Sequence, residues 1–234
     1  MTDKDLERLD SGITAEHVNA PQFYAFHDRF APDWQHNSEV NDAHAQVGRL
    51  VIDPDLLERA TWEVEARTNF LHLSFYELDQ WYTEGIMTPF LYQFVQTCRR
   101  RFSDLVQLDA QNYPNKEPLH DGYVQVGRYK PNPVTAWHVD TMTPNHPGKI
   151  DDKIPTDITY TMALLGGATT YSAQGHRRGD FTEAGYLLDP PESTATYSPK
   201  VVAVHHGAMA PHAAPDEAHA RLFMNYRLYG AFKA

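Results

Sequence analysis

The sequence predicts an α+β fold with a helix-rich first half and a strand-rich second half. In residues 1–120, apolar residues recur at helical spacing behind two helix-start signals, Asp53-Pro54 and Thr88-Pro89. After Asp121-Gly122 the chain consists of short alternating runs separated by turn residues. Helices followed by strands are typical of α+β proteins, and the second half fits a β-sandwich or a barrel-like arrangement.

Composition bounds the class of protein and its surroundings. The chain has 234 residues, 41% hydrophobic and 12% aromatic, so we expect one soluble globular domain over 1–234. Its formal net charge of −11 argues against a nucleic-acid or membrane-surface partner, because both need a basic face. No run approaches the length of a membrane span. The polar start MTDKDLERLD and the single cysteine, Cys98, predict a cytoplasmic location without disulfides.

Two helices are predicted in the first half. Asp53 caps a helix that begins at Pro54 and continues over 54–67. Thr88-Pro89 opens the longest helical pattern, whose apolar stripe runs over 90–106. On that helix we expect the basic run 99–101 to form a solvated face.

The remaining first-half segments are less patterned. Residues 22–26 fit a short strand or an aromatic plug, residues 50–52 fit a short strand, and residues 70–76 fit a strand or a helix. Four histidines at irregular spacing are expected to be surface or packing residues rather than ligands: His17, His27, His36 and His44.

In the second half, alternating or apolar runs predict strands over 123–129, 159–165, 168–172, 201–204 and 220–229. Two long polar segments, 141–157 and 173–199, interrupt these strands. Loops of this length are usually functional covers, so we expect both segments to cover a substrate.

The most informative residues for chemistry are His138 and Asp140. Side chains two residues apart on a strand point to the same face. An imidazole and a carboxylate placed in this way supply two of the three ligands of a 2-His-1-carboxylate site for non-haem Fe(II). The alternating run 123–129, the turn signal 130–133 and the strand-like 134–137 predict a hairpin with this pair on its second strand.

The C-terminal region offers four histidines as a third ligand: His205, His206, His212 and His219. In the strand that follows, one face carries Arg221, Asn225 and Arg227, and the other face is apolar. If the polar face is buried, its guanidinium groups need an anionic partner, since an unpaired buried charge is very costly. A dicarboxylate held by arginine is such a partner.

These motifs resemble the Fe(II)/2-oxoglutarate-dependent dioxygenase superfamily, in particular its prolyl-hydroxylase-like and alkylation-repair-like branches. The similar phrases are an Arg-Tyr-x-Pro turn before His-x-Asp, a distal His-x-x-Pro after an apolar strand, and an Arg-x-x-x-Asn-x-Arg strand. Here they are Arg128 to Pro131, His138 to Asp140, His212 to Pro215, and Arg221 to Arg227. The resemblance covers residues 123–229.

The resemblance implies a double-stranded β-helix, which is a jelly-roll, cupin-like core, over 121–234, with the helix-rich 1–120 packed on it. It implies that His138, Asp140 and His212 bind Fe(II), with His206 as the alternative third ligand. It also implies that four residues bind 2-oxoglutarate: Arg221, Tyr129, Arg227 and Asn225.

The implied reaction consumes O2 and hydroxylates a small molecule, an amino acid or a protein side chain. Succinate and CO2 are the implied co-products. Gly127 departs from the repair branch, which has asparagine there, and Asp140 favours oxygen insertion over halogenation. Two other interpretations stay open: a cupin-type metalloenzyme that does not use 2-oxoglutarate, and a non-catalytic β-sandwich that binds a ligand.

Overall fold

The computed structural model describes residues 1–18, 44–105, 121–130, 137–139, 158–176, 178–182, 185–206, 210–215 and 218–228. Within these ranges the chain forms helices and antiparallel strands, so the mixed fold class predicted from the sequence is confirmed. The helical elements are α1 (Asp3–Gly12), α3 (Pro54–Glu65), α4 (Glu77–Thr83), α5 (Pro89–Leu105) and the short 3-10 helix η4 (Arg178–Asp180).

The strands form a larger and a smaller antiparallel sheet. The larger sheet has the order β1-β2-β8-β5-β10-β4-β3 and the smaller one β7-β6-β9. The larger sheet contains β1 (Ile13–His17), β2 (His44–Ile52), β3 (Leu71–Ser74), β4 (Asp121–Tyr129), β5 (Ile158–Leu165), β8 (Val201–His206) and β10 (His219–Leu228). The smaller sheet contains β6 (Thr170–Ser172), β7 (Thr194–Thr196) and β9 (His212–Ala213).

His138 belongs with the smaller sheet, which differs from the predicted hairpin. Among the described residues, β4 pairs with β3 and β10, whereas His138 forms bridges with His212 and Tyr186. From β4 onward the chain crosses repeatedly between the sheets: β5, β8 and β10 lie in the larger one, and β6, β7 and β9 lie in the smaller one. The local alternation predicted extended backbone at His138 correctly but assigned it the wrong partner.

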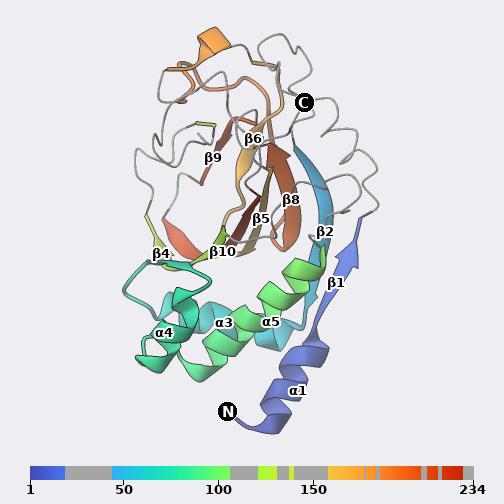
Figure 1. Ribbon diagram of the computed structural model, residues 1–234, viewed down its shortest axis with the longest axis vertical. Coiled ribbons are helices and arrows are strands. Elements are labelled where there is room, and N and C mark those ends of the chain that lie inside the picture. The colour runs from blue at the N-terminus through green and yellow to red at the C-terminus, as the bar shows by residue number, and fades with distance from the viewer. Residues whose placement is uncertain are drawn as a thin grey trace.

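One face of the larger sheet packs against the helices. Helix α5 contacts β1 and β2, and α3 contacts β4 and β10 (Figure 1). The ring of Phe102 on α5 stacks on Tyr226 of β10 with centroids 4.8 Å apart. Both rings belong to a continuous apolar core that includes Phe94, Val124 and Met162. Burial of this apolar area is the main source of stability on this side.

The two predicted helix starts are confirmed. The Asp53 carboxylate accepts hydrogen bonds from the backbone N–H groups of Asp55 and Leu56, at 2.9 and 3.4 Å. The Thr88 hydroxyl accepts a hydrogen bond from the N–H of Leu91 at 3.1 Å. Each side chain satisfies backbone donors that the first helical turn leaves without partners. Residues 71–74, for which strand and helix were both open, form β3.

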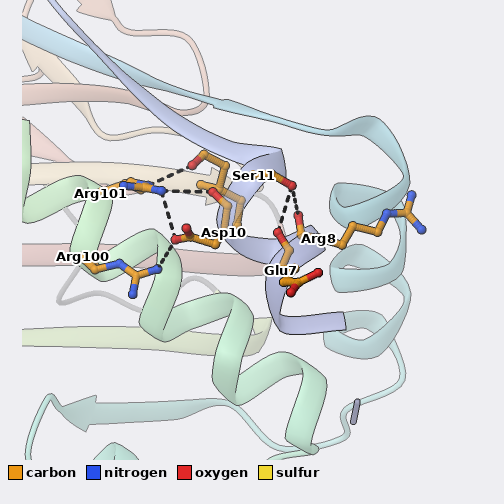
Figure 2. A network of polar contacts seen from close by, with 7 residues as sticks. Glu7, Arg8, Asp10, Ser11, Arg100 and Arg101 are labelled. Atoms are coloured by element: carbon orange, nitrogen blue, oxygen red, sulfur yellow. Dashed lines mark hydrogen bonds and ion pairs between the residues drawn. The ribbon is translucent and has the colours of Figure 1, made fainter. Parts of the chain in front are cut away.

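The basic run 99–101 on α5 contacts the end of α1 (Figure 2). Arg100 and Arg101 donate hydrogen bonds to the Asp10 carboxylate at 2.7 and 3.0 Å. Arg101 also donates to the backbone carbonyl of Ile13 at 2.9 Å. Arg99 instead lies over the Phe75 ring, 4.3 Å from its centroid. The run is therefore only partly the solvated face that the sequence predicts.

The lengths of the described helices and the burial of Cys98 bear on the expected surroundings of the protein. No helix among the described residues is long and apolar enough to cross a membrane. Cys98 is buried on α5, and burial raises the pKa of its thiol. A protonated, inaccessible thiol is unreactive, so Cys98 acts as a packing residue of the core.

Candidate functional site: a histidine pair beside a buried arginine

The larger sheet has a second buried face, on the side away from the helices, and the predicted residues Arg221 and Asn225 lie there. Alternate positions of β10 divide between the two faces. The core beside the helices takes Leu222, Met224 and Tyr226. The other face of β10 carries Arg221, Phe223 and Asn225, all of them buried. We call this second side the inner face.

Strand register extends the inner face across the sheet. Asn225 lies opposite Thr161 on β5, and Thr159 lies opposite His205 on β8. Opposite residues of antiparallel strands project to the same side. The hydroxyls of Thr161 and of Tyr171 on β6 are 2.9 Å apart. The inner face is therefore turned toward the smaller sheet.

His138 and His212 meet in the smaller sheet. The N–H of His138 donates to the carbonyl of His212 at 3.0 Å, and the N–H of His212 donates to the carbonyl of His138 at 2.9 Å. The two ring centroids are 4.5 Å apart. The structure thus brings together the two histidines that the sequence predicts as metal ligands.

A backbone contact fixes the protonation of the His212 ring. Its Nδ1 lies 2.9 Å from the carbonyl oxygen of Ala210. A carbonyl oxygen can only accept a hydrogen bond, so Nδ1 carries the proton and Nε2 keeps its lone pair in the neutral ring. Metal-binding histidines usually have this arrangement, with the other ring nitrogen bonded to a carbonyl or a carboxylate.

The histidine pair fits a metal ion in geometry. With metal–nitrogen bonds of about 2.1 Å, two imidazoles bound at right angles have ring centroids about 4.5 Å apart. The observed separation of His138 and His212 is 4.5 Å. No group of three or more His, Cys, Asp or Glu donors that could hold a metal occurs within the described ranges. Asp140, the predicted carboxylate ligand, lies outside them.

Arg221 is the most unusual buried group on the inner face. Its residue is 3% exposed, and its Nε and Nη1 atoms have no hydrogen-bond partner among the described residues. The guanidinium carbon lies 4.4 Å from the centroid of Phe223 and 5.0 Å from that of Tyr129. Burial lowers the pKa of Arg221, while Tyr123 and Tyr129 act in the opposite direction. Arginine nevertheless stays charged in proteins, so this site favours an anion.

Two further polar atoms on the inner face are in the same situation. Tyr129 Oη and Asn225 Oδ1 are buried and have no hydrogen-bond partner within the described part of the chain. Buried polar groups in native proteins are nearly always satisfied. Together with Arg221 they form a set of polar groups suited to a small ligand that carries both charge and hydrogen-bonding atoms.

A second group of residues adjoins the histidine pair. His205 is 1% exposed, and its ring centroid lies 4.7 Å from that of His212. Its Nδ1 is 3.3 Å from Tyr171 Oη. His44 stacks on Tyr171 with centroids 4.9 Å apart, and its Nδ1 lies 2.9 Å from the Tyr197 hydroxyl. His44 is therefore the packing histidine that the sequence predicts.

Other predicted site residues are described only in part. For His206 and Arg227 the structure gives the backbone, in β8 and β10, and no side chain. The predicted cover 141–157 lies outside the described residues. Part of the other predicted cover, 173–199, adjoins the site, because residues 185–187 form backbone hydrogen bonds with 137–139. The N–H of Val139 donates to the carbonyl of Gly185, and the N–H of Leu187 donates to the carbonyl of Trp137.

His205 on the inner face and Tyr171 on β6 lie near the histidine pair, and the resemblance assigned neither of them to the site. His205 was only one of four histidines offered as a third ligand, and Tyr171 was only part of the predicted strand 168–172. The alternation in β8 could have identified His205, because Val202 and Val204 belong to the helix-facing core. Ala203 and His205 then fall on the opposite side.

Comparison with known proteins gives matches only among solved structures. No protein-family model matches the chain, and no curated protein matches it. The chain is similar to the non-haem α-ketoglutarate-dependent epimerase SnoN of nogalamycin biosynthesis at 16% identity over 76% of this chain and 84% of that one, with a TM-score of 0.36.

Two Streptomyces proteins match a larger share of the chain. HygX of Streptomyces hygroscopicus, with nickel and 2-oxoglutarate bound, is 12% identical over 99% of this chain and 88% of that one, with a TM-score of 0.41. AviO1 of Streptomyces viridochromogenes is 10% identical over 82% and 91%, with a TM-score of 0.39. Similarities this low do not establish a shared family or activity.

Proposed function

We propose that this chain is an Fe(II)- and 2-oxoglutarate-dependent dioxygenase that hydroxylates a C–H bond. The observation that carries the proposal is Arg221, a buried guanidinium with two nitrogens unpartnered among the described residues. It lies on the face that is turned toward the sheet of His138 and His212. A buried cation on the face turned toward two imidazoles suits a dicarboxylate that would bind a metal with one end and arginine with the other.

The strand order supports a double-stranded β-helix for 121–234. The order of β8-β5-β10-β4 in one sheet, and of β7-β6-β9 with the bridge of His138 to β9 in the other, is that of a jelly roll. In this proposal the helix-rich 1–120 is the support of a single domain.

We assign the metal to His138, Asp140 and His212. Bound iron would supply the activation of O2, with oxidation of 2-oxoglutarate to succinate and CO2. The chain itself would prepare His212 for this role: the Ala210 carbonyl holds the proton of the ring on Nδ1, and Nε2 would be the atom that binds the metal. His206 remains the alternative third ligand.

We assign the co-substrate to Arg221, Tyr129 and Asn225, with Arg227 as a further candidate. Arg221 would bind the carboxylate far from the metal, and the Tyr129 hydroxyl would donate a hydrogen bond to it. Asn225 lies further along the same strand, where it can contact the middle of an extended ligand. The aromatic rings beside Arg221 exclude water, which strengthens its attraction for an anion.

The proposed substrate is a small molecule, an amino acid or a protein side chain. The net charge of −11 disfavours a nucleic acid, for which an enzyme needs a basic surface. We retain the cytoplasm as the proposed location. Two of the similar solved structures are named as an α-ketoglutarate-dependent epimerase and an α-ketoglutarate-dependent carbocyclase, and these names agree with the proposed co-substrate.

The test is anaerobic titration of Fe(II) with and without 2-oxoglutarate, in which bidentate binding of the oxoacid gives a visible charge-transfer band. We expect the band in wild type and in His206→Ala, and its loss in His212→Ala and Arg221→Ala. Loss of the band in His206→Ala alone would reassign the third ligand.

Two results would replace the proposed function. Metal binding without any band in wild type would favour a cupin-type metalloenzyme that does not use 2-oxoglutarate. The absence of tight metal binding would favour a non-catalytic ligand-binding module.

A further inference from the structure

His205 lies close enough to the metal-ligand pair to contact whatever the metal binds. Its ring centroid is 4.7 Å from that of His212, and it is almost completely buried, at 1% exposure. It projects from β8 on the inner face, opposite Thr159 of β5. A buried imidazole in this position would face groups bound at such a metal from the side of the larger sheet.

A chain of hydroxyl groups orients the His205 ring. Thr161 Oγ1 lies 2.9 Å from Tyr171 Oη, and Tyr171 Oη lies 3.3 Å from His205 Nδ1. If Thr161 donates to Tyr171, the tyrosine proton is available to His205 Nδ1. The neutral imidazole then carries its proton on Nε2, which becomes a hydrogen-bond donor.

We propose that His205 is a further co-substrate-binding residue, whose Nε2–H donates a hydrogen bond to the carboxylate of 2-oxoglutarate bound at the metal. The proposal rests on the proposed function. A carboxylate oxygen is a strong acceptor, and a donor whose ring is held by a second hydrogen bond loses little entropy on binding it. Arg221 and His205 would then hold the two ends of the ligand.

The described donors argue against His205 as a metal ligand. His138, His205 and His212 are all described, yet no group of three metal-binding donors occurs among the described residues. Moreover, His138, His212 and a carboxylate already provide three ligands, and a fourth would leave no position for oxygen beside a bidentate co-substrate. His205 is therefore assigned to the bound ligand rather than to the metal.

The test compares His205→Leu with His205→Gln, because the glutamine amide nitrogen reproduces a donor near the position of Nε2. Affinities for Fe(II) alone and for 2-oxoglutarate on the Fe(II) protein are measured without oxygen, from the charge-transfer band. We expect His205→Leu to bind Fe(II) within about threefold of wild type, and 2-oxoglutarate at least about tenfold more weakly with a shifted band. His205→Gln should recover most of the affinity.

Tyr171→Phe and His17→Ala complete the experiment. Tyr171→Phe removes the hydroxyl that orients His205, so we expect an intermediate loss of 2-oxoglutarate affinity even if His205→Leu fails to fold. His17 is an exposed histidine on β1, and its replacement should change neither affinity.

Three outcomes overturn the assignment. Unchanged 2-oxoglutarate affinity in His205→Leu shows that no such hydrogen bond exists. Loss of Fe(II) binding in His205→Leu but not in Tyr171→Phe makes His205 a ligand instead. A wild-type protein that gives no band with 2-oxoglutarate removes the proposed function itself, and with it this role of His205.

Discussion

The two faces of the larger sheet are both buried, but they are built from opposite chemistry. The helix-facing side is apolar in every strand, with residues such as Val124, Met162 and Leu222 at or below 1% exposure. The inner face buries Thr159, His205 and Arg221 to a similar degree. Burial alone therefore does not distinguish the helix-facing side of the sheet from the side that carries the candidate site, whereas the satisfaction of polar groups does.

The difference has an energetic consequence. Apolar burial on the helix side stabilises the fold by about 25 cal/mol per Å² of area removed from water. A buried charge without a partner among the described residues, as on the inner face, acts in the opposite sense, because it has lost its hydration. We therefore expect the helix side to stabilise the fold and the inner face to gain its partners when a ligand binds.

The largest effect on stability is expected from Phe102→Ala. The side chain is 0% exposed and stacks on Tyr226, so its removal leaves a cavity in the core. We expect a loss of about 3–5 kcal/mol in the free energy of unfolding, measured by urea denaturation. Trp62→Ala on the exposed side of α3 is the matched control, since Trp62 is 68% exposed and its loss should change little. Equal losses of unfolding free energy in Phe102→Ala and Trp62→Ala would contradict the stabilising role of the helix-facing core.

Arg221→Met should preserve or raise the stability of the fold but weaken the binding of 2-oxoglutarate. It replaces a buried, partly unsatisfied charge by an apolar chain of similar length, so the free energy of unfolding of the ligand-free protein should stay unchanged or rise by about 1–4 kcal/mol. Binding of 2-oxoglutarate to the Fe(II) protein should fall at least about a hundredfold. Destabilisation comparable to that of Phe102→Ala would mean that Arg221 is a structural residue.

Ionic contacts on the helix side are expected to contribute little. Asp10→Ala removes the hydrogen bonds that Arg100 and Arg101 donate to α1 (Figure 2). Both Asp10 and Arg100 are largely exposed, so we expect a loss below about 1 kcal/mol by urea denaturation, and less at high salt. A loss as large as that of a core truncation would show that charge, rather than apolar burial, holds this side together.

The smallest expected effect is a pH dependence of stability that comes from His176. This residue follows β6 of the smaller sheet. Its Nε2 lies 2.6 Å from the Ser172 hydroxyl, and burial lowers the pKa of His176 from 6.5, although Asp180 partly opposes this. The unfolded chain therefore takes up the proton first. The contribution of neutral His176 to the free energy of unfolding is fully present above pH 6.5. It is lost as the pH falls through the lowered folded-state pKa of His176.

The comparison variant for this pH effect is His176→Gln. Thermal unfolding midpoints of wild type and variant are measured from about pH 8 to about pH 5. We expect the midpoint of wild type to decline more than that of the variant over this interval. Parallel curves would show that His176 does not carry the effect.

The sequence predicted the parts of the fold that depend on local chemistry. Asp53 and Thr88 were recognised as helix starts because capping needs only neighbouring residues. The parity of β10 predicted a polar and an apolar face, and Arg221 and Asn225 are indeed buried on one side. Which sheet each strand joins depends on contacts far apart in sequence, so His138 was assigned to a hairpin rather than to a bridge with His212.

The site shows the same limit. His138 and His212 could be selected from sequence because their motifs resemble those of a known superfamily. His205 has no such motif, and its position beside His212 follows from the pairing of β8 with β5 and the packing of β6. Pairing of this kind is a property of the whole fold and not of the segment around residue 205.

We infer that an anionic co-substrate completes the inner face. Isothermal titration calorimetry of 2-oxoglutarate into anaerobic, Fe(II)-loaded protein tests it most directly, with wild type and Arg221→Met compared under the same conditions. We predict saturable binding to wild type and no measurable binding to Arg221→Met. Equal binding to both proteins, or no binding to either, would contradict the claim.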